Sequence, residues 1–353
     1  MVKILLNDLL AFKLSWPSIY GPNNYLRSLR MGELSDSSCK PDDFTFEKML
    51  GEGGEGSVMK VKRRMENGYD MVVALKERMC PDEDFQMMID NEVDIMRIID
   101  HPNVVHIYDY FFNDSSIFPD ICRTPNERKA YIVMDYCDLG SLDHFFKKNY
   151  PQLPLPMNIL EKIIVDILNV VFFIHTEYDI IHRDLKAENI LMKSDPADPD
   201  NVIVKLGDFG SSKMISEGNP LATKRIGTDV FMAPEIANPQ ATEYNYKCDI
   251  YSLGAMFYYL TTHIPPFGTD KNNRILFNIQ HEIPITFDKT VWSDREDLKD
   301  LVENMLTIDF NQRYGWPQIH RHPFVKRIMK EDLDDTPKDY SKLRVVREPK
   351  RKA

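Results

Sequence analysis

A dense polar cluster lies between two apolar pairs in this sequence. The cluster is residues 182–189 (HRDLKAEN), with the pairs 180–181 before it and 190–191 after it. Because apolar flanks anchor a segment in a core, we expect these polar side chains to be held rigidly. Asp184 is suited to orient a hydroxyl and accept its proton, while Lys186 adds a positive charge two residues away.

A second carboxylate follows a run that predicts a β-strand, residues 202–206 (VIVKL). Asp208 lies between glycines in the sequence GDFG, which suits a metal ligand that other groups approach closely. Together with Asp184 and the amide oxygen of Asn189, it forms the kind of oxygen donor set that Mg²⁺ shares with phosphates. Any one of these residues is an ordinary loop residue, and only the ordered set favours chemistry.

These stretches resemble the catalytic loop and the metal-binding loop of eukaryotic protein kinases. The run 182–189 matches H-R-D-L-x-x-x-N, and residues 208–210 match D-F-G. In that family the protein positions ATP, Mg²⁺ and a hydroxyl for phosphoryl transfer. The roles that the resemblance implies are catalytic for Asp184, Lys186 and Asn189, and metal-binding for Asn189 and Asp208.

The resemblance also implies an α+β fold of two lobes with ATP and Mg²⁺ between them. The expected kinase domain is residues 44–326, since the family's closing H-P-F is present at its end. A small β-rich N-lobe with one main helix would occupy 44–137, and a larger, mainly helical C-lobe 138–326. Residues 1–43 would be an extension or linker, and 327–353 a basic tail.

A glycine-rich stretch, residues 50–58 (LGEGGEGSV), contains G-x-G-x-x-G. Glycines let a hairpin fold over phosphates without Cβ clashes, but the motif also occurs in dinucleotide sites and plain turns. A dinucleotide site needs a helix directly afterwards, whereas residues 58–62 predict a second strand and therefore a hairpin. The nucleotide contacts implied here are Gly51, Glu52, Gly53, Gly54, Gly56 and Val58.

A strand ending in V-A-L-K carries Lys76, which the resemblance assigns to the α and β phosphates of ATP. Residues 83–99 predict an amphipathic helix, because apolar residues recur at three- and four-residue steps. Within this helix the resemblance favours Glu92 as the partner of Lys76. Glu83 and Asp90 are the alternatives, and the following H-P-N-V-V run sets the register.

Residues 131–137 (YIVMDYC) resemble the strand and hinge that hold the adenine ring. The likeness makes Met134 the gatekeeper and assigns hydrogen bonds with the base to the backbone of Asp135 and Cys137. It also adds Ala74 and Leu191 to the nucleotide contacts. Residues 113–129 lengthen a connection that is usually a tight turn, and we expect an exposed insertion there.

The polar stretch 211–229 ends in G-T and is followed by A-P-E, which resembles the peptide-docking segment of Ser/Thr kinases. Lys186 also favours serine and threonine substrates, since tyrosine kinases usually lack this lysine. Arg183 beside the catalytic aspartate predicts regulation by an upstream kinase, because a phosphate on the loop would find an arginine partner. Thr223 is the first candidate for this phosphate and Ser216 the second.

Two further elements follow the family pattern in the C-terminal half. The run 249–254 (DIYSLG) resembles the helix whose aspartate braces the catalytic loop, and Arg313 is expected to pair with Glu235 of A-P-E. The basic run 350–352 is most simply a frayed end, with a nuclear signal as the alternative.

Composition limits the remaining classes. The net charge of −11 over 353 residues argues against nucleic acid as a partner. Five scattered cysteines without a C-x-x-C pair favour an intracellular, most simply cytoplasmic, location. The apolar start, residues 1–14, is interrupted by charges and is too short for a transmembrane segment, so we interpret it as a docking helix.

Two rival functions use the same motifs. A pseudokinase would act as a binding module and typically lacks one of Lys76, Asp184, Asn189 or Asp208, all of which are present. A small-molecule kinase is disfavoured by the G-T and A-P-E segment. The sequence therefore predicts a protein kinase that transfers the γ-phosphoryl group of ATP to serine or threonine hydroxyls of protein substrates.

Overall fold

The computed structural model divides the chain into two units, Met1–Asp36 and Ser37–Ala353. The structure describes residues 39–53, 56–121, 127–151, 155–214, 230–238, 243–268, 284–329 and 345–347, all in the second unit. The helix expected at residues 1–14 lies outside these ranges.

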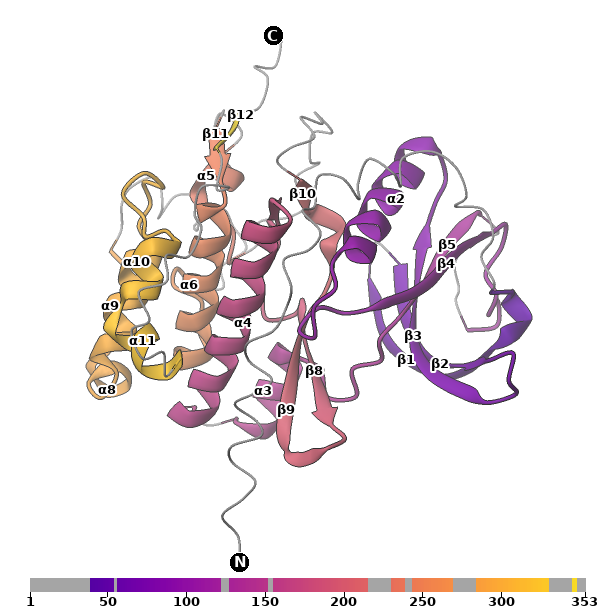
Figure 1. The fold of residues 1–353 in the computed structure, drawn as a ribbon, viewed down its shortest axis with the longest axis horizontal. Coiled ribbons are helices and arrows are strands. Elements are labelled where there is room, and N and C mark those ends of the chain that lie inside the picture. Colours follow the sequence, from indigo (N-terminus) through magenta and orange to yellow (C-terminus); the bar gives the residue numbers. More distant parts are fainter. Residues whose placement is uncertain are drawn as a thin grey trace, which may run out of the picture. The chain divides into compact units, whose positions relative to one another are not determined.

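A five-stranded antiparallel sheet begins the described part of the chain (Figure 1). Its strands follow the order β1-β2-β3-β5-β4, and a short 3-10 helix, Pro41–Asp43, precedes them. One face of the sheet holds an apolar core that includes Val61, Val73, Leu75 and Tyr131. The strands are β1 (Phe44–Gly53), β2 (Gly56–Arg64), β3 (Asp70–Met79), β4 (Ile107–Asn113) and β5 (Lys129–Met134).

Helix α2 (Glu83–Ile98) follows β3 and begins where Asp82 caps it. The carboxylate of Asp82 accepts a hydrogen bond of 3.0 Å from the amide of Phe85, which satisfies one of the helix's free donors. Ile89, Val93 and Met96 are buried, as their spacing predicted.

The insertion between β4 and β5 is only partly described, and its first part is not the exposed segment that was expected. Ser116 is buried, and Ile117 and Phe118 pack against the core of the sheet. The reason is a buried carboxylate, Glu77 on β3, which needs donors. It accepts hydrogen bonds from the hydroxyls of Ser116 (2.9 Å) and Tyr131 (2.6 Å).

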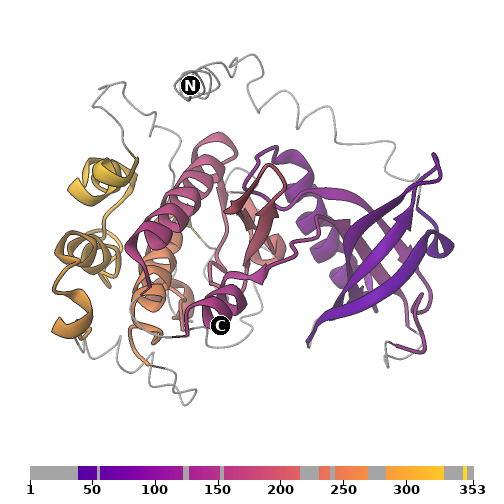
Figure 2. The same cartoon turned by 90° about the horizontal axis from the view of Figure 1, so that it is seen from below.

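The C-terminal part is mainly helical (Figure 2). Helix α6 is buried from Cys248 to Thr262, and it packs so closely on α9 that a Cβ at Gly254 would lie 2.8 Å from Met305 Cβ. No helix among the described residues is long and apolar enough to cross a membrane. The helices are α3 (Leu142–Asn149), α4 (Met157–Glu177), α5 (Pro234–Ala237), α6 (Lys247–Thr262), α8 (Lys289–Trp292), α9 (Glu296–Met305), α10 (Trp316–Arg321) and α11 (Pro323–Met329).

Short strands in the C-terminal part position its loops. The hairpin of β8 (Ile190–Asp195) and β9 (Asp198–Leu206) follows the loop of Asp184 and precedes the loop of Asp208. The strand predicted over residues 202–206 is the second half of β9, which begins at Asp198. Outside the hairpin, β6 pairs with β8, β7 with β10, and β11 with β12. These strands are β6 (Gly140–Ser141), β7 (Ile180–Ile181), β10 (Lys213–Met214), β11 (Glu243–Asn245) and β12 (Val345–Arg347).

The glycine-rich stretch forms the predicted hairpin, because β1 and β2 pair as far as Gly53 opposite Gly56. Gly56 has a φ of +145°, and a Cβ there would lie 1.9 Å from the carbonyl oxygen of Glu77. Nothing lies within 4 Å of a Cβ built at Gly51 or Gly53. Of these three glycines, only Gly56 is therefore required by the described contacts, while Gly51 and Gly53 each have open space around the Cβ position.

We expect Gly56→Ala to lower the free energy of unfolding by about 1–3 kcal/mol, because the new methyl group meets a strand backbone at a strained φ. Gly53→Ala is the matched control and should change stability by less than about 0.5 kcal/mol. Urea denaturation of both variants measures the difference. Equal stability of the two variants would contradict the assigned role of Gly56.

Candidate active site

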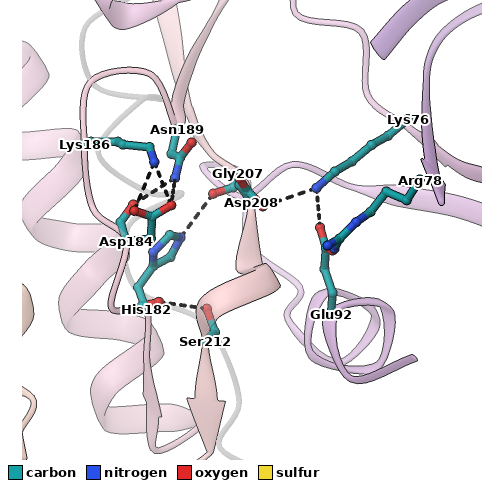
Figure 3. Close-up of polar contacts among 10 residues, drawn as sticks. All are labelled: Lys76, Arg78, Glu92, His182, Asp184, Lys186, Asn189, Gly207, Asp208 and Ser212. Atoms are coloured by element: carbon teal, nitrogen blue, oxygen red, sulfur yellow. Dashed lines mark hydrogen bonds and ion pairs between the residues drawn. The ribbon is translucent and has the colours of Figure 1, made fainter. Parts of the chain in front are cut away.

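Lys76 lies on β3 and contacts two carboxylates (Figure 3). Its Nζ atom is 2.7 Å from Oε1 of Glu92 and 3.2 Å from Oδ1 of Asp208. Burial alone would lower the pKa of Lys76, but the charges of Glu92 and Asp208 raise it, so the amine is a cation at neutral pH. Of the alternative partners, Asp90 instead accepts a hydrogen bond from Tyr110, and Glu83 is exposed.

Glu92 has a second cationic partner that the motif comparison missed. The Nη1 atom of Arg78 lies 2.6 Å from Oε2 of Glu92, so both carboxylate oxygens are engaged. Arg78 is two residues after Lys76 on β3, and side chains at that spacing share one face of a strand. This period of two was the one signal in the sequence that could have suggested the contact.

Asp208 projects from a strained turn after β9. Its backbone is left-handed, with φ 58° and ψ 74°, a conformation that aspartate adopts more readily than most residues. Desolvation by itself would raise its pKa, but the adjacent charge and hydrogen bond of Lys76 lower it to about 2. Since its side chain is still 40% exposed, Asp208 offers an ionised carboxylate to a ligand.

Asp184 and Asn189 lie together in the loop between β7 and β8. Asn189 Nδ2 donates to the backbone carbonyl of Asp184 at 2.9 Å and to its Oδ2 at 2.8 Å. These bonds use both amide hydrogens and leave Oδ1 of Asn189 as the atom that suits a metal. Lys186 Nζ lies 3.0 Å and 2.9 Å from the two Asp184 carboxylate oxygens.

The donor set fits Mg²⁺ that is shared with a nucleotide. The described residues contain no group of three or more His, Cys, Asp or Glu side chains arranged to hold a metal alone. The ionised Asp208 and the amide oxygen of Asn189 would supply only part of an octahedral shell, which matches the habit of Mg²⁺ of keeping waters and phosphate oxygens.

His182 joins the two loops. Its Nε2 donates to the carbonyl of Gly207 at 3.1 Å, since a carbonyl can only accept. The amide of Gly207 in turn donates to the carbonyl of Asn189 at 3.0 Å. Asp208 is thereby placed beside the loop of Asp184, as Figure 3 shows.

Asp249 on α6 holds the same loop from below. Its carboxylate accepts hydrogen bonds of 2.8 Å from the amides of His182 and Arg183 and from Nε2 of His175. Trp316 donates its indole N–H to Nδ1 of His175 at 2.9 Å, which fixes the histidine proton on Nε2. Burial raises the pKa of Asp249, but these hydrogen bonds outweigh that effect and lower it.

The hinge residues border the expected adenine site. Ala74 on β3 lies opposite Met134 on β5, and Val58 lies opposite Lys76. The amide of Asp135 donates to the carbonyl of His106 at 2.9 Å, so of its two backbone groups the carbonyl is left to meet a base. Cys137, which is buried, and Leu191 on β8 complete the set of predicted contacts that the structure describes.

Arg183 lies where the loop with the predicted phosphorylation sites begins. Its Nε donates to the carbonyl of Ser211 at 2.6 Å, and its Nη1 lies 3.3 Å from the hydroxyl of Tyr244. The predicted regulatory sites Thr223 and Ser216, and the predicted nucleotide contact Gly54, lie outside the described residues.

The expected pair of Glu235 and Arg313 is present as two parallel contacts. Nη1 of Arg313 lies 2.6 Å from Oε1 of Glu235, and Nη2 lies 3.0 Å from Oε2. Arg313 is buried and also donates to the carbonyls of Thr307, Ile308 and Lys247. It therefore connects the A-P-E segment to the start of α6 and to the residues that follow α9.

Comparisons with known proteins show the family to which the chain belongs. A family model described as "Protein kinase domain" matches residues 44–325, and the chain belongs to this family. Similar proteins are "Serine/threonine-protein kinase 36" of Mus musculus, 28% identical over 280 residues, and "Aurora kinase" of Candida glabrata, 26% identical over 309 residues. "Serine/threonine-protein kinase 33" of Bos taurus is 27% identical over 282 residues.

These matches cover 79%, 88% and 78% of this chain, and 19%, 76% and 54% of the respective relatives. The alignment with the first of them therefore spans about a fifth of that relative's length. The family assignment supports the expected α+β fold, in which a β-rich N-terminal sheet precedes a helical C-terminal part.

We expect Asp249→Asn to lower the free energy of unfolding by roughly 2–4 kcal/mol, because the new amide would place a donor against donors in a buried site.

The pH dependence of stability follows from the pKa of Asp249, which is lowered in the fold. The contribution of Asp249 to stability is therefore complete above the ordinary aspartate pKa range and is lost as the pH falls below that range. Denaturant unfolding between pH 3 and 7 measures both effects.

The matched control is Asp300→Asn. Asp300 is also 2.8 Å from a histidine ring, that of His322, but its side chain is 62% exposed. Its loss should cost less than about 1 kcal/mol. Equal losses of unfolding free energy in the two variants would show that the burial of Asp249 does not determine its contribution to stability.

Proposed function

We propose that this chain is a protein kinase that transfers the γ-phosphoryl group of ATP to serine or threonine hydroxyls of protein substrates. The observation that carries the proposal is the contact series from Glu92 through Lys76 to Asp208, and from there through the Gly207–His182 bond to the loop of Asp184. The printed names of the relatives as Ser/Thr kinases, and Lys186 beside Asp184, support the substrate class.

Each residue has a distinct part in the proposed mechanism. Lys76 binds the α and β phosphates of ATP, while Asp208 and Asn189 hold Mg²⁺. Bound Mg²⁺ supplies charge neutralisation at the phosphate oxygens. Asp184 orients the substrate hydroxyl and accepts its proton, and Lys186 offsets charge on the transferred phosphoryl group. Positioning and charge, rather than covalent chemistry, lower the barrier.

We expect Asp184→Asn to reduce phosphoryl transfer by at least ~100-fold, because the amide cannot accept the proton. ATP binding should change little, since the proposed phosphate and metal contacts come from other residues. Labelled ATP with a generic protein substrate measures transfer, and calorimetry measures ATP binding. Asp294→Asn, at a side chain that is 72% exposed, is the control and should retain full activity.

Two results would separate the rival functions. If Asp184→Asn transferred phosphate as fast as the unmodified chain, the catalytic assignment would be wrong. If the unmodified chain bound ATP but transferred none to any protein, the chain would be a binding module on the same fold. Phosphoamino acid analysis of the labelled product tests the preference for serine and threonine over tyrosine.

We also propose that phosphorylation of the loop by an upstream kinase raises activity, with Thr223 as the first candidate for the modified residue and Ser216 as the second. The support is Arg183, whose guanidinium group lies at Ser211, where the loop begins. A phosphate on the loop would find a cationic partner in this guanidinium group.

The expected result is that phosphorylated unmodified chain is roughly tenfold or more faster than Thr223→Ala after the same upstream treatment. Ser216→Ala should respond to that treatment almost as the unmodified chain does. Steady-state rates with phosphorylation checked by mass spectrometry decide this. Equal turnover of Thr223→Ala and the phosphorylated unmodified chain would remove the proposal.

We place the protein inside the cell, most simply in the cytoplasm. Among the described residues, none of Cys39, Cys80, Cys137 and Cys248 forms a disulfide, in keeping with a reducing compartment. Entry into the nucleus through the basic run 350–352 is the alternative that the sequence offers.

A further inference from the structure

Strand β3 presents two cations to one carboxylate. Lys76 and Arg78 lie on the same face of the strand, at 2.7 Å and 2.6 Å from the two oxygens of Glu92. The side chain of Glu92 is only 2% exposed, and that of Arg78 is 7% exposed. Because charge-assisted bonds of this length in a buried site are strong, Arg78 contributes substantially to holding Glu92.

The need for a second cation follows from what Lys76 has to do. In the structure, Lys76 and Arg78 are balanced by Glu92 and Asp208. In the proposed mechanism, Lys76 would bind the phosphates of ATP, and the carboxylate of Asp208 would bind the metal. With Lys76 as its sole cationic partner, Glu92 would have to share that cation with the nucleotide while remaining buried, which is unfavourable for a carboxylate. Arg78 keeps Glu92 paired throughout.

The metal-binding loop packs directly on this pair. A Cβ at Gly210 would lie 3.4 Å from Oε2 of Glu92 and 3.5 Å from Nη1 of Arg78. The same Cβ would lie 3.4 Å from Oδ1 of Asp208. The position of Arg78 is therefore linked by close contact both to helix α2, through Glu92, and to the loop that carries Asp208.

We propose that Arg78 is a positioning residue: it holds Glu92, and with it helix α2, independently of Lys76, and so leaves the charge of Lys76 available to the phosphates of ATP. This inference rests on the proposed kinase function, although it concerns nucleotide binding and the helix before any phosphoryl transfer.

The test uses Arg78→Met, Arg78→Lys, Lys76→Met and the double variant in the full chain. Calorimetry with ATP and Mg²⁺ measures affinity, hydrogen exchange measures protection of residues 83–98, and steady-state kinetics give kcat and the KM for ATP. We expect Arg78→Met to weaken ATP binding about tenfold, to raise the KM for ATP and to speed exchange in α2. Arg78→Lys, which retains a cation, should recover most of the affinity.

The double variant tests whether the effect passes through Lys76. If it does, adding Arg78→Met to Lys76→Met should change ATP affinity by less than about twofold and still speed exchange in α2. An undiminished tenfold loss in that background would overturn the proposal, because Arg78 would then contact the nucleotide itself. Unchanged exchange and affinity in Arg78→Met would overturn it as well.

Two controls distinguish loss of the Arg78 charge from unfolding and from loss of side-chain packing. Circular dichroism and melting temperature establish that each variant is folded, and recovery in Arg78→Lys separates the cation's role from packing of the side chain. If the unmodified chain bound ATP yet transferred no phosphate, the proposed function would fail. The binding and exchange results would still decide the role of Arg78.

Discussion

A carboxylate buried away from water must be given donors, and the architecture of this site depends on how that demand is met at Asp249. The donors are two consecutive amides of the loop that carries Asp184 and one histidine ring from α4. Since a buried carboxylate without donors is costly, the loop cannot leave this position without a large loss of stability. Asp249 thus fixes the backbone on which Asp184 depends.

Glu92 on helix α2 is a second buried carboxylate, and its donors are charged side chains from the N-terminal sheet. Two side chains from one strand engage its oxygens, so α2 is bound to β3 by charge as well as by apolar packing. The two anchored regions meet through Asp208, which contacts Lys76 by its side chain and follows Gly207, the acceptor of His182. A disturbance at either buried carboxylate is therefore expected to reach the loop that carries Asp208.

Much of the site could be predicted from the sequence where the signal was local. The glycine spacing with a following strand predicted the hairpin, because residues close in the sequence determine the local backbone. The helical period predicted the helix itself, but the choice of Glu92 over Glu83 and Asp90 came from the resemblance, with H-P-N-V-V setting the register.

The features that sequence reasoning missed depend on contacts between distant segments. Trp316 and His175 are 141 residues apart, and nothing near either residue indicates that one sets the proton position of the other. In the sequence Glu77 is an ordinary charged residue of a predicted strand. Only the fold shows that it is buried and that Ser116 of the insertion donates a hydrogen bond to it. Partners of buried polar groups are determined by tertiary packing, which local patterns do not encode.

The backbone is strained at Arg183 and at Asp208, and hydrogen bonds hold it in this conformation. Arg183, next to Asp184, has a φ of +67°, and Asp208 has a φ of +58°; neither is glycine. Such conformations persist only where the surroundings enforce them. The amide of Arg183 is held by Asp249 and the carboxylate of Asp208 by Lys76. Asp249 and Lys76 thus hold the two backbone conformations on which the proposed reaction would depend through positioning and charge.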